Sequence, residues 1–322
     1  MEFAYHRLAR SAPGYRWWKS IVTGLIALGF FIGFTIVLVV LLLLSTLAFP
    51  EVRPVITKLL TTGTIDNSLP VVLAFSLSSI AVILPSIWLA RLIMGPRPVG
   101  LLSSIAGRLR WRWMLRLILP VVIAYGASTL SSVLLLPLLT GGSIPPPVVS
   151  STTWIVVLAA VLLVPLQATA EEFFFRGYLA QMIGGWLKHP LFAILLPVPL
   201  FTIGHQYDVW GLIDVSVFAV VAGWLVWRTG GLEASIVAHV VNNTVIFVIG
   251  AFGLIDVNSK TGSGLSVVIS ALTLALYAWL VLRAAKRFGL ARVRVVTLPP
   301  PPDPSTIVHS ESGTEDAVAP HG

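Results

Sequence analysis

Cysteine is absent from the 322-residue chain. The protein therefore has no disulfide, no thiolate metal ligand and no cysteine nucleophile. Charge is also scarce, because Asp, Glu, Lys and Arg make up 11% of the residues while hydrophobic residues make up 57%. Soluble domains carry about 25% charged residues. This composition excludes an ordinary soluble domain and predicts a polytopic membrane protein, in which chemistry falls to histidine, carboxylates, asparagine and hydroxyls.

The excess of 21 Lys and Arg over 13 Asp and Glu gives a net charge of +8. These basic residues lie in short segments beside apolar runs, the pattern that sets membrane orientation. They do not form one soluble module, so we expect the lipid bilayer as a partner and no nucleic acid. The first apolar run is too long for a signal peptide and is expected to remain as an anchor.

The hydropathy pattern predicts an all-α bundle of about eight transmembrane helices. The fifth contains Pro197 and Pro199, which lack backbone donors and predict a kink or break. The expected spans are 21–49, 70–94, 114–139, 153–183, 191–205, 209–227, 234–252 and 264–282.

An even number of spans places both termini on one side, and the distribution of basic residues makes that side cytoplasmic. The predicted location is the cell membrane, with the protein as a multi-pass integral component. The organisation expected is a cytoplasmic segment 1–20, three transmembrane helices within 21–152, a catalytic core 153–253, a last transmembrane helix within 254–282, and a tail 283–322 that begins basic and becomes disordered.

The segment Glu171-Glu172-Phe173-Phe174-Phe175-Arg176-Gly177 places three ionisable side chains in the fourth span. Each costs roughly 2.5–3.5 kcal/mol at the centre of a membrane helix, so such residues usually mark a functional site. Glu172 and Arg176 are four apart and are expected to pair on one helix face. This pairing leaves Glu171 free as a proton acceptor.

Two further polar clusters follow, Phe201-Thr202-Ile203-Gly204-His205 and His239-Val240-Val241-Asn242-Asn243. His239 and Asn243 share a helix face. A carboxylate or histidine can remove a proton from water while histidine and asparagine stabilise an oxyanion, so the three clusters are typical of a buried hydrolytic site. The structural alternative is hydrogen bonding between helices, which rarely needs full charges.

Glu-Glu-x-x-x-Arg, Phe-x-x-x-His and His-x-x-x-Asn, in this order on membrane helices, resemble the signature motifs of the CPBP family. That family comprises intramembrane proteases, including type II CAAX prenyl endopeptidases, and Abi bacteriocin-immunity proteins. The resemblance covers roughly Thr153 to Phe252. It implies that Glu171 and His205 activate water, that His239 and Asn243 form the oxyanion hole, and that Glu172 and Arg176 support Glu171.

The function expected is an intramembrane endopeptidase acting on a membrane-associated protein or peptide. Asn242 is a second amide that competes for the role of Asn243. The sequence commits to no cofactor: a set of histidines and a carboxylate suits a divalent metal such as zinc, and metal-free water activation is favoured over that alternative. Two alternatives stay open: a non-catalytic bacteriocin-immunity or peptide-binding membrane protein, and a proton-coupled transporter.

Overall fold

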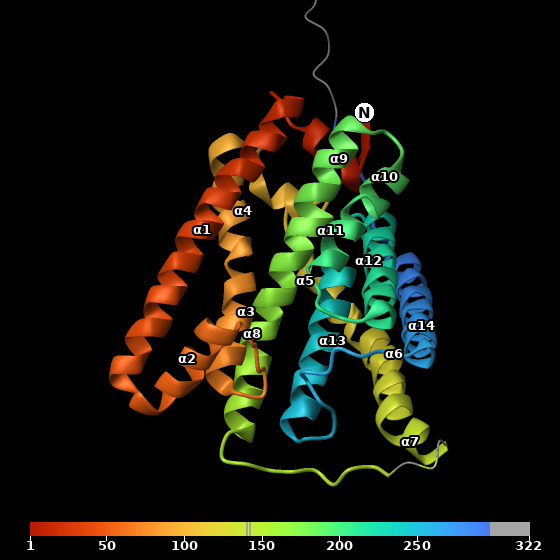
Figure 1. Cartoon of the computed structure of the whole chain (residues 1–322). Coiled ribbons are helices and arrows are strands. Elements are labelled where there is room, and N and C mark those ends of the chain that lie inside the picture. Colours follow the sequence, from red (N-terminus) through yellow and green to blue (C-terminus); the bar gives the residue numbers. More distant parts are fainter. Residues whose placement is uncertain (140, 142, 297–322) are drawn as a thin grey trace, which may run out of the picture.

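The fold is that of a computed structural model, which describes residues 1–139, 141 and 143–296. It is a bundle of helices with almost no sheet (Figure 1). Within the described ranges, seven helical runs are long and apolar enough to cross a membrane. The protein is therefore a multi-pass integral membrane protein, as its composition predicts.

Three of the seven runs contain more than one helical element. The π-helix η5 continues α8 without a break directly after Glu172. The runs are α1 (Trp17–Ala48), α3 with α4 (Pro70–Ala81, Ile83–Met94), α6 with the π-helix η4 and α7 (Ile118–Leu130, Ser131–Leu135, Leu136–Leu139), α8 with η5 and α9 (Thr153–Glu172, Phe173–Leu179, Ala180–Trp186), α12 (Val209–Thr229), α13 (Glu233–Ala251) and α14 (Gly264–Phe288).

Short elements connect these runs or lie at their ends. They are the strands β1 (Glu2–Ala4) and β2 (Val293–Val295), the 3₁₀ helices η1 (Tyr5–Ser11), η2 (Pro50–Val52) and η3 (Val99–Leu102), and the helices α2 (Arg53–Thr62) and α5 (Trp111–Arg116).

The fifth predicted span differs from a full transmembrane helix. It consists of α10 (Pro190–Leu195) and α11 (Pro197–Ile203). At 1.5 Å per residue these two helices together cover about 20 Å, less than the roughly 30 Å hydrocarbon core. Pro197 has no N–H to donate to the carbonyl of Ala193, which separates the two helices. The predicted eight spans are therefore seven long runs and one short, broken pair.

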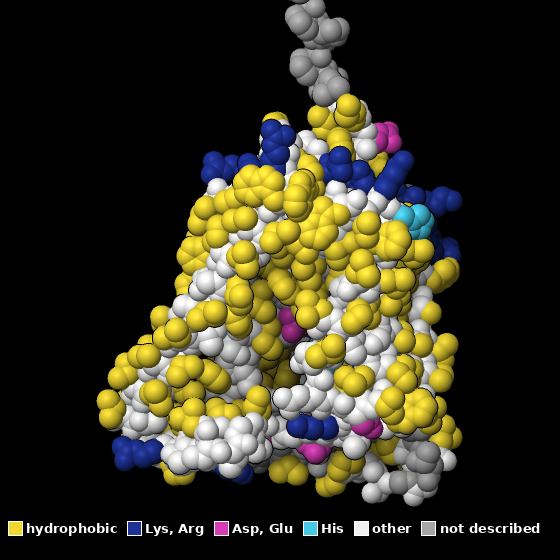
Figure 2. Space-filling view, turned by 45° about the horizontal axis from the view of Figure 1, so that its top comes forward, with side chains coloured by type: hydrophobic (Ala, Val, Ile, Leu, Met, Phe, Trp, Pro, Cys, Tyr) yellow, Lys and Arg dark blue, Asp and Glu magenta, His cyan; other side chains and the backbone are white. Residues whose placement is uncertain are grey.

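The two ends of the described chain lie together. Strand β1 pairs antiparallel with β2, with Glu2 opposite Val295. The N-terminal ammonium also donates to the carbonyl of Val296 at 2.9 Å. Figure 2 shows many Lys and Arg side chains gathered at this end of the molecule. A shared end agrees with an even number of passes, while its cytoplasmic location stays a prediction.

The N-terminal segment is a folded part of the bundle. Tyr5 and Leu8 of η1 are buried, and Arg10 Nη1 donates to the Gly185 carbonyl at 2.9 Å. His6 Nε2 lies 3.1 Å from the Lys188 carbonyl. A Cβ on Gly184 would overlap the His6 backbone, so the contact between η1 and α9 requires glycine there.

The last helix is longer than the predicted boundary at residue 282. Its N-terminus is a capping box between Ser263 and Ser266, and it ends at Phe288, before Gly289 with a φ of 63°. The basic part of the predicted tail is therefore the end of α14 and strand β2. The disorder expected for the rest of the tail concerns residues 297–322, outside the described residues.

Helix α8 lies at the centre of the bundle, between α3 and α13 (Figure 1). Ala160 and Val164 of α8 are fully buried and form a cluster with Leu73 and Leu77 of α3. The small side chain of Ala160 lets the helices approach closely. This packing brings α13, with its histidine and asparagine, alongside the glutamates of α8.

Candidate active site

The three charged residues of the fourth span differ in burial. Glu172 is 0% exposed, Arg176 4% and Glu171 9%. Glu172 Oε1 accepts from Arg176 Nη1 at 3.1 Å. The predicted pair is therefore present, although Arg176 lies in the π-helix η5 and not in an α-helix. Isolated π-helical turns inside long helices are often found at functional sites.

His239 of α13 lies between the two glutamates. Its Nδ1 is 2.9 Å from Glu172 Oε1, and its Nε2 is 3.4 Å from Glu171 Oε2. A neutral imidazole donates from one nitrogen only. Two carboxylate contacts therefore need either an imidazolium or a proton on one carboxyl group. Glu172 holds the ring by its hydrogen bond to Nδ1, whereas Glu171 Oε2, among the described residues, has no hydrogen-bond partner and only lies near Nε2.

Phenylalanine rings surround the Arg176 guanidinium. Its central carbon lies 4.2 Å from the ring centroid of Phe201, 5.5 Å from that of Phe218 and 5.9 Å from that of Phe175. Such cation–π contacts contribute about 2 kcal/mol when desolvated. The rings and Glu172 together stabilise a charge that the membrane interior would otherwise exclude.

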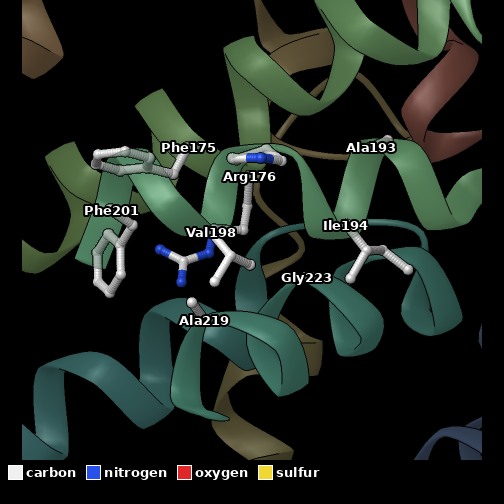
Figure 3. A pocket seen from close by; sticks show the side chains of 9 residues that line it. Phe175, Arg176, Ala193, Ile194, Val198, Phe201, Ala219 and Gly223 are labelled. Atoms are coloured by element: carbon white, nitrogen blue, oxygen red, sulfur yellow. The ribbon is translucent and has the colours of Figure 1, made fainter. Parts of the chain in front are cut away.

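A small pocket lies beside Arg176 (Figure 3). Its walls come from η5, α10, α11 and α12, and its volume is about 10 Å³, which is close to the size of one water molecule. Among the described residues, Arg176 Nη2 has no hydrogen-bond partner. Ala193, whose carbonyl receives no N–H from Pro197, also lines the pocket. A water here would have both a donor and an acceptor.

His205 follows the broken helix pair, in the loop after α11. Its Nδ1 is 2.9 Å from the Phe201 carbonyl, and its ring stacks on Tyr207 at 5.9 Å. A carbonyl only accepts, so Nδ1 carries the hydrogen in this contact. In the neutral ring Nε2 is then the proton-accepting nitrogen, as a base requires.

The structure does not bring His205 into hydrogen-bond contact with Glu171. Among the described residues, the imidazole that contacts Glu171 is that of His239. The joint activation of water by Glu171 and His205 that the resemblance implies stays a prediction, since the two side chains make no direct hydrogen bond. The physical reason is that α8 packs along α13, whereas His205 is held by its own helix end and by Phe201, whose ring centroid is 4.9 Å away.

Asn243 lies one turn after His239 and faces α8. Its Nδ2 donates to Gln167 Oε1 at 3.4 Å, and its Oδ1 accepts from Asn242 Nδ2 at 3.0 Å. Gln167 is one turn before Glu171, so the amide pair extends the polar face along the α8–α13 interface. Asn242 orients Asn243 in this arrangement.

The polar residues do not converge as metal ligands. Within the described ranges, no three His, Asp or Glu side chains are grouped closely enough to hold an ion. His205 directs Nδ1 to a backbone carbonyl, while both nitrogens of His239 face carboxylates. These residues do not form the ligand set that zinc would need.

Comparison with known proteins identifies a family for the segment that carries the three polar clusters. Residues 150–245 match the family model for the type II CAAX prenyl endopeptidase Rce1-like proteins. This segment is Rce1-like. The match contains all three clusters and confirms the family predicted from the motifs.

The Rce1-like segment also resembles a curated bacterial protein. That relative is the uncharacterised protein YyaK of Bacillus subtilis (strain 168), 39% identical over 87 residues. The alignment covers 25% of this chain and 29% of the relative. No solved structure matches the chain.

Two features of the site were not evident from the sequence. Phe218 lies on α12, which carries no signature motif, and its ring is 5.0 Å from that of His239. Phe201 is in the second motif, but its position between Arg176 and both histidines depends on how α11 packs. For Phe218 the sequence signal is no more than an aromatic side chain in a span adjacent to charged ones, whereas Phe201 is marked by the Phe-x-x-x-His motif.

Proposed function

We propose that the protein is an intramembrane endopeptidase that hydrolyses a peptide bond of a membrane-associated protein or peptide. The contact between Glu171 and His239, beside the buried Glu172–Arg176 pair, is the observation that carries the proposal. The match to the Rce1-like family supports the same chemistry. The cell membrane is the proposed location.

In the proposed reaction, Glu171 accepts a proton from water while the water oxygen attacks the peptide carbonyl carbon. The C–N bond then breaks, and the proton passes to the leaving amine. His205 Nε2 is a second acceptor for that water. His239 and Asn243 are proposed to donate to the oxyanion, and His239 does so when its Nε2 carries a hydrogen.

Glu172 and Arg176 act as positioning residues in this proposal. Glu172 is fully buried and accepts from both Arg176 and His239 at one oxygen. Its carboxylate therefore determines the orientation of the His239 ring. Arg176 balances the negative charge so that Glu172 remains ionised within the bundle.

The test is cleavage of peptides by the full-length protein in liposomes. The panel contains matched peptides with and without a prenylated cysteine, because the substrate class is open. Wild-type protein is expected to cleave at least one series, while Glu171→Ala and His205→Ala inactivate the enzyme and leave it inserted and folded. Full activity in either variant would overturn the mechanism.

Two further results would favour the other classes of protein. Peptide binding without cleavage by the wild-type protein would indicate an immunity or binding protein. Solute flux that stops in the Glu171→Ala variant, again without cleavage, would indicate a transporter.

A further inference from the structure

A basic pocket lies between α5 and α14, away from the candidate active site. Its lining residues are Arg112, Leu115, Arg116 and Phe288, and its volume is about 460 Å³. Arg116 lies over the ring of Phe288 at 4.5 Å, and Trp113 stacks on the same ring at 6.0 Å. Trp113 is fully buried, so the aromatic floor of the pocket is fixed by the bundle.

A second, separate basic groove lies on the outward-facing side of α14, because Arg283 is about 140° around the helix from Phe288. It is lined by Trp279, Leu282, Arg283, Lys286 and Arg287 and has a volume of about 650 Å³. These residues recur every three or four positions and therefore share one helix face. Arg283 lies over the Trp279 ring at 5.3 Å.

The cations of both grooves lack acidic neighbours. Within the part of the chain that the structure describes, no carboxylate lies within 4 Å of any of them, in contrast to Arg110, which pairs with Glu233 at 2.6 Å. Among the same described residues, none that lines either groove is acidic. The five cations are Arg112, Arg116, Arg283, Lys286 and Arg287.

An apolar surface extends from the basic pocket toward the middle of the bundle. Leu115 and Leu119 on α5 and α6 are 66% and 67% exposed, and Leu272 on α14 is 65% exposed. Leu115 lines the basic pocket and Leu119 follows it by one helical turn, whereas Leu272 shares the outward face of α14 with Arg283. The surface thus combines cations and aromatic rings at the basic pocket with exposed leucine side chains next to it.

We propose that the pocket between α5 and α14, lined by Arg112, Arg116 and Phe288, is a binding site for an anionic phospholipid. The guanidinium groups match a phosphodiester in charge and geometry. Basic pockets between membrane helices bind anionic headgroups in this way. The acyl chains lie along the exposed Leu115 and Leu119 of α5 and α6.

Native mass spectrometry of the full-length protein in detergent tests the site. Phosphatidylglycerol and phosphatidylcholine are titrated separately, with matched acyl chains. Phosphatidylglycerol is expected to bind the wild-type protein at least tenfold more tightly. Arg112→Gln and Arg116→Gln combined should weaken its binding on the order of 25-fold, from about fivefold per cation.

The matched control removes two cations from the opposite end of the bundle, as Arg53→Gln and Lys58→Gln. This control variant is expected to bind phosphatidylglycerol as the wild-type protein does. An equal loss in the control, or no preference for the anionic lipid in the wild-type protein, would overturn the proposal.

Two additional measurements distinguish a lipid site from misfolding of the variants and from a site for free anions. Arg112→Gln alone leaves the contact between Arg116 and Phe288 intact. About fivefold weaker lipid binding in this variant, with unchanged thermal stability, would show that the loss is not a consequence of misfolding. Inorganic phosphate at millimolar concentration is expected not to displace the lipid. Displacement by phosphate would indicate a free-anion site and contradict a lipid site.

Discussion

Replacing Glu171 or Glu172 by glutamine distinguishes the catalytic role proposed for Glu171 from the positioning role proposed for Glu172. Glu172→Gln removes the charge from a fully buried carboxylate and leaves Arg176 without a counterion. Breaking a buried ion pair costs about 3–5 kcal/mol. The glutamine carbonyl still accepts one hydrogen bond and the phenylalanine rings still face the guanidinium, so we expect a loss of about 3 kcal/mol in the free energy of unfolding.

Glu171→Gln is expected to behave in the opposite way. Glu171 is 9% exposed, and its contact with His239 is long, at 3.4 Å. The variant should change the free energy of unfolding by less than about 1 kcal/mol. Loss of the proton acceptor should lower the rate constant for peptide cleavage by about 100-fold to 10,000-fold.

The assay is unfolding of the reconstituted protein by SDS, followed by tryptophan fluorescence, with cleavage rates measured on the same preparations. Each variant is the matched control of the other. Equal destabilisation in the two variants, or Glu172→Gln as stable as the wild-type protein, would refute the division of roles between Glu171 and Glu172.

Three further predictions concern other parts of the protein. Gly223→Val should fill the pocket beside Arg176 and lower cleavage activity, because Gly223 lines this pocket and its new Cβ would lie 3.3 Å from Ile194. Gly126→Val is the control, since a side chain there meets no neighbouring atoms among the described residues. Equal cleavage activities in the two variants would show that the pocket is not needed for cleavage. Burial lowers the pKa of His6, so protonation favours the undocked segment and docking should weaken as pH falls below about 6.5. Hydrogen exchange of residues 2–11 measures this. His6→Gln should remove the pH dependence, whereas a dependence that survives would implicate His189. Treatment with a zinc chelator should leave cleavage unchanged, and loss of activity that zinc restores would contradict metal-free water activation.

Local geometry explains why the Glu172–Arg176 pair could be predicted. Its partners are four apart in one helix, so their contact depends little on the rest of the fold. The spans 70–94 and 209–227 were predicted for a similar reason, since each is a continuous apolar run that ends near glycine or a polar loop. The break in the fifth span was predicted from Pro197 and Pro199, but not its reduction to two helices of six and seven residues.

Contacts between helices could not be read from spacing. Signature motifs place His205 and His239 in the same site, yet only packing of α13 on α8 determines that His239 contacts both glutamates. The π-helix after Glu172 changes the direction of the side chains that follow it, which a regular 3.6-residue period does not anticipate. Pairing of β1 with β2 was likewise missed, because each strand has only three residues.

The most direct test of the proposed endopeptidase compares protein termini in membranes. Membranes from cells that produce the wild-type protein and from cells that produce the Glu171→Ala variant at the same level are analysed by mass spectrometry. Proteolysis by Glu171 predicts new N- or C-termini in membrane-associated proteins or peptides with the wild-type protein alone. Identical termini in both membranes, with the wild-type protein folded and its natural partners present, would contradict the proposed function.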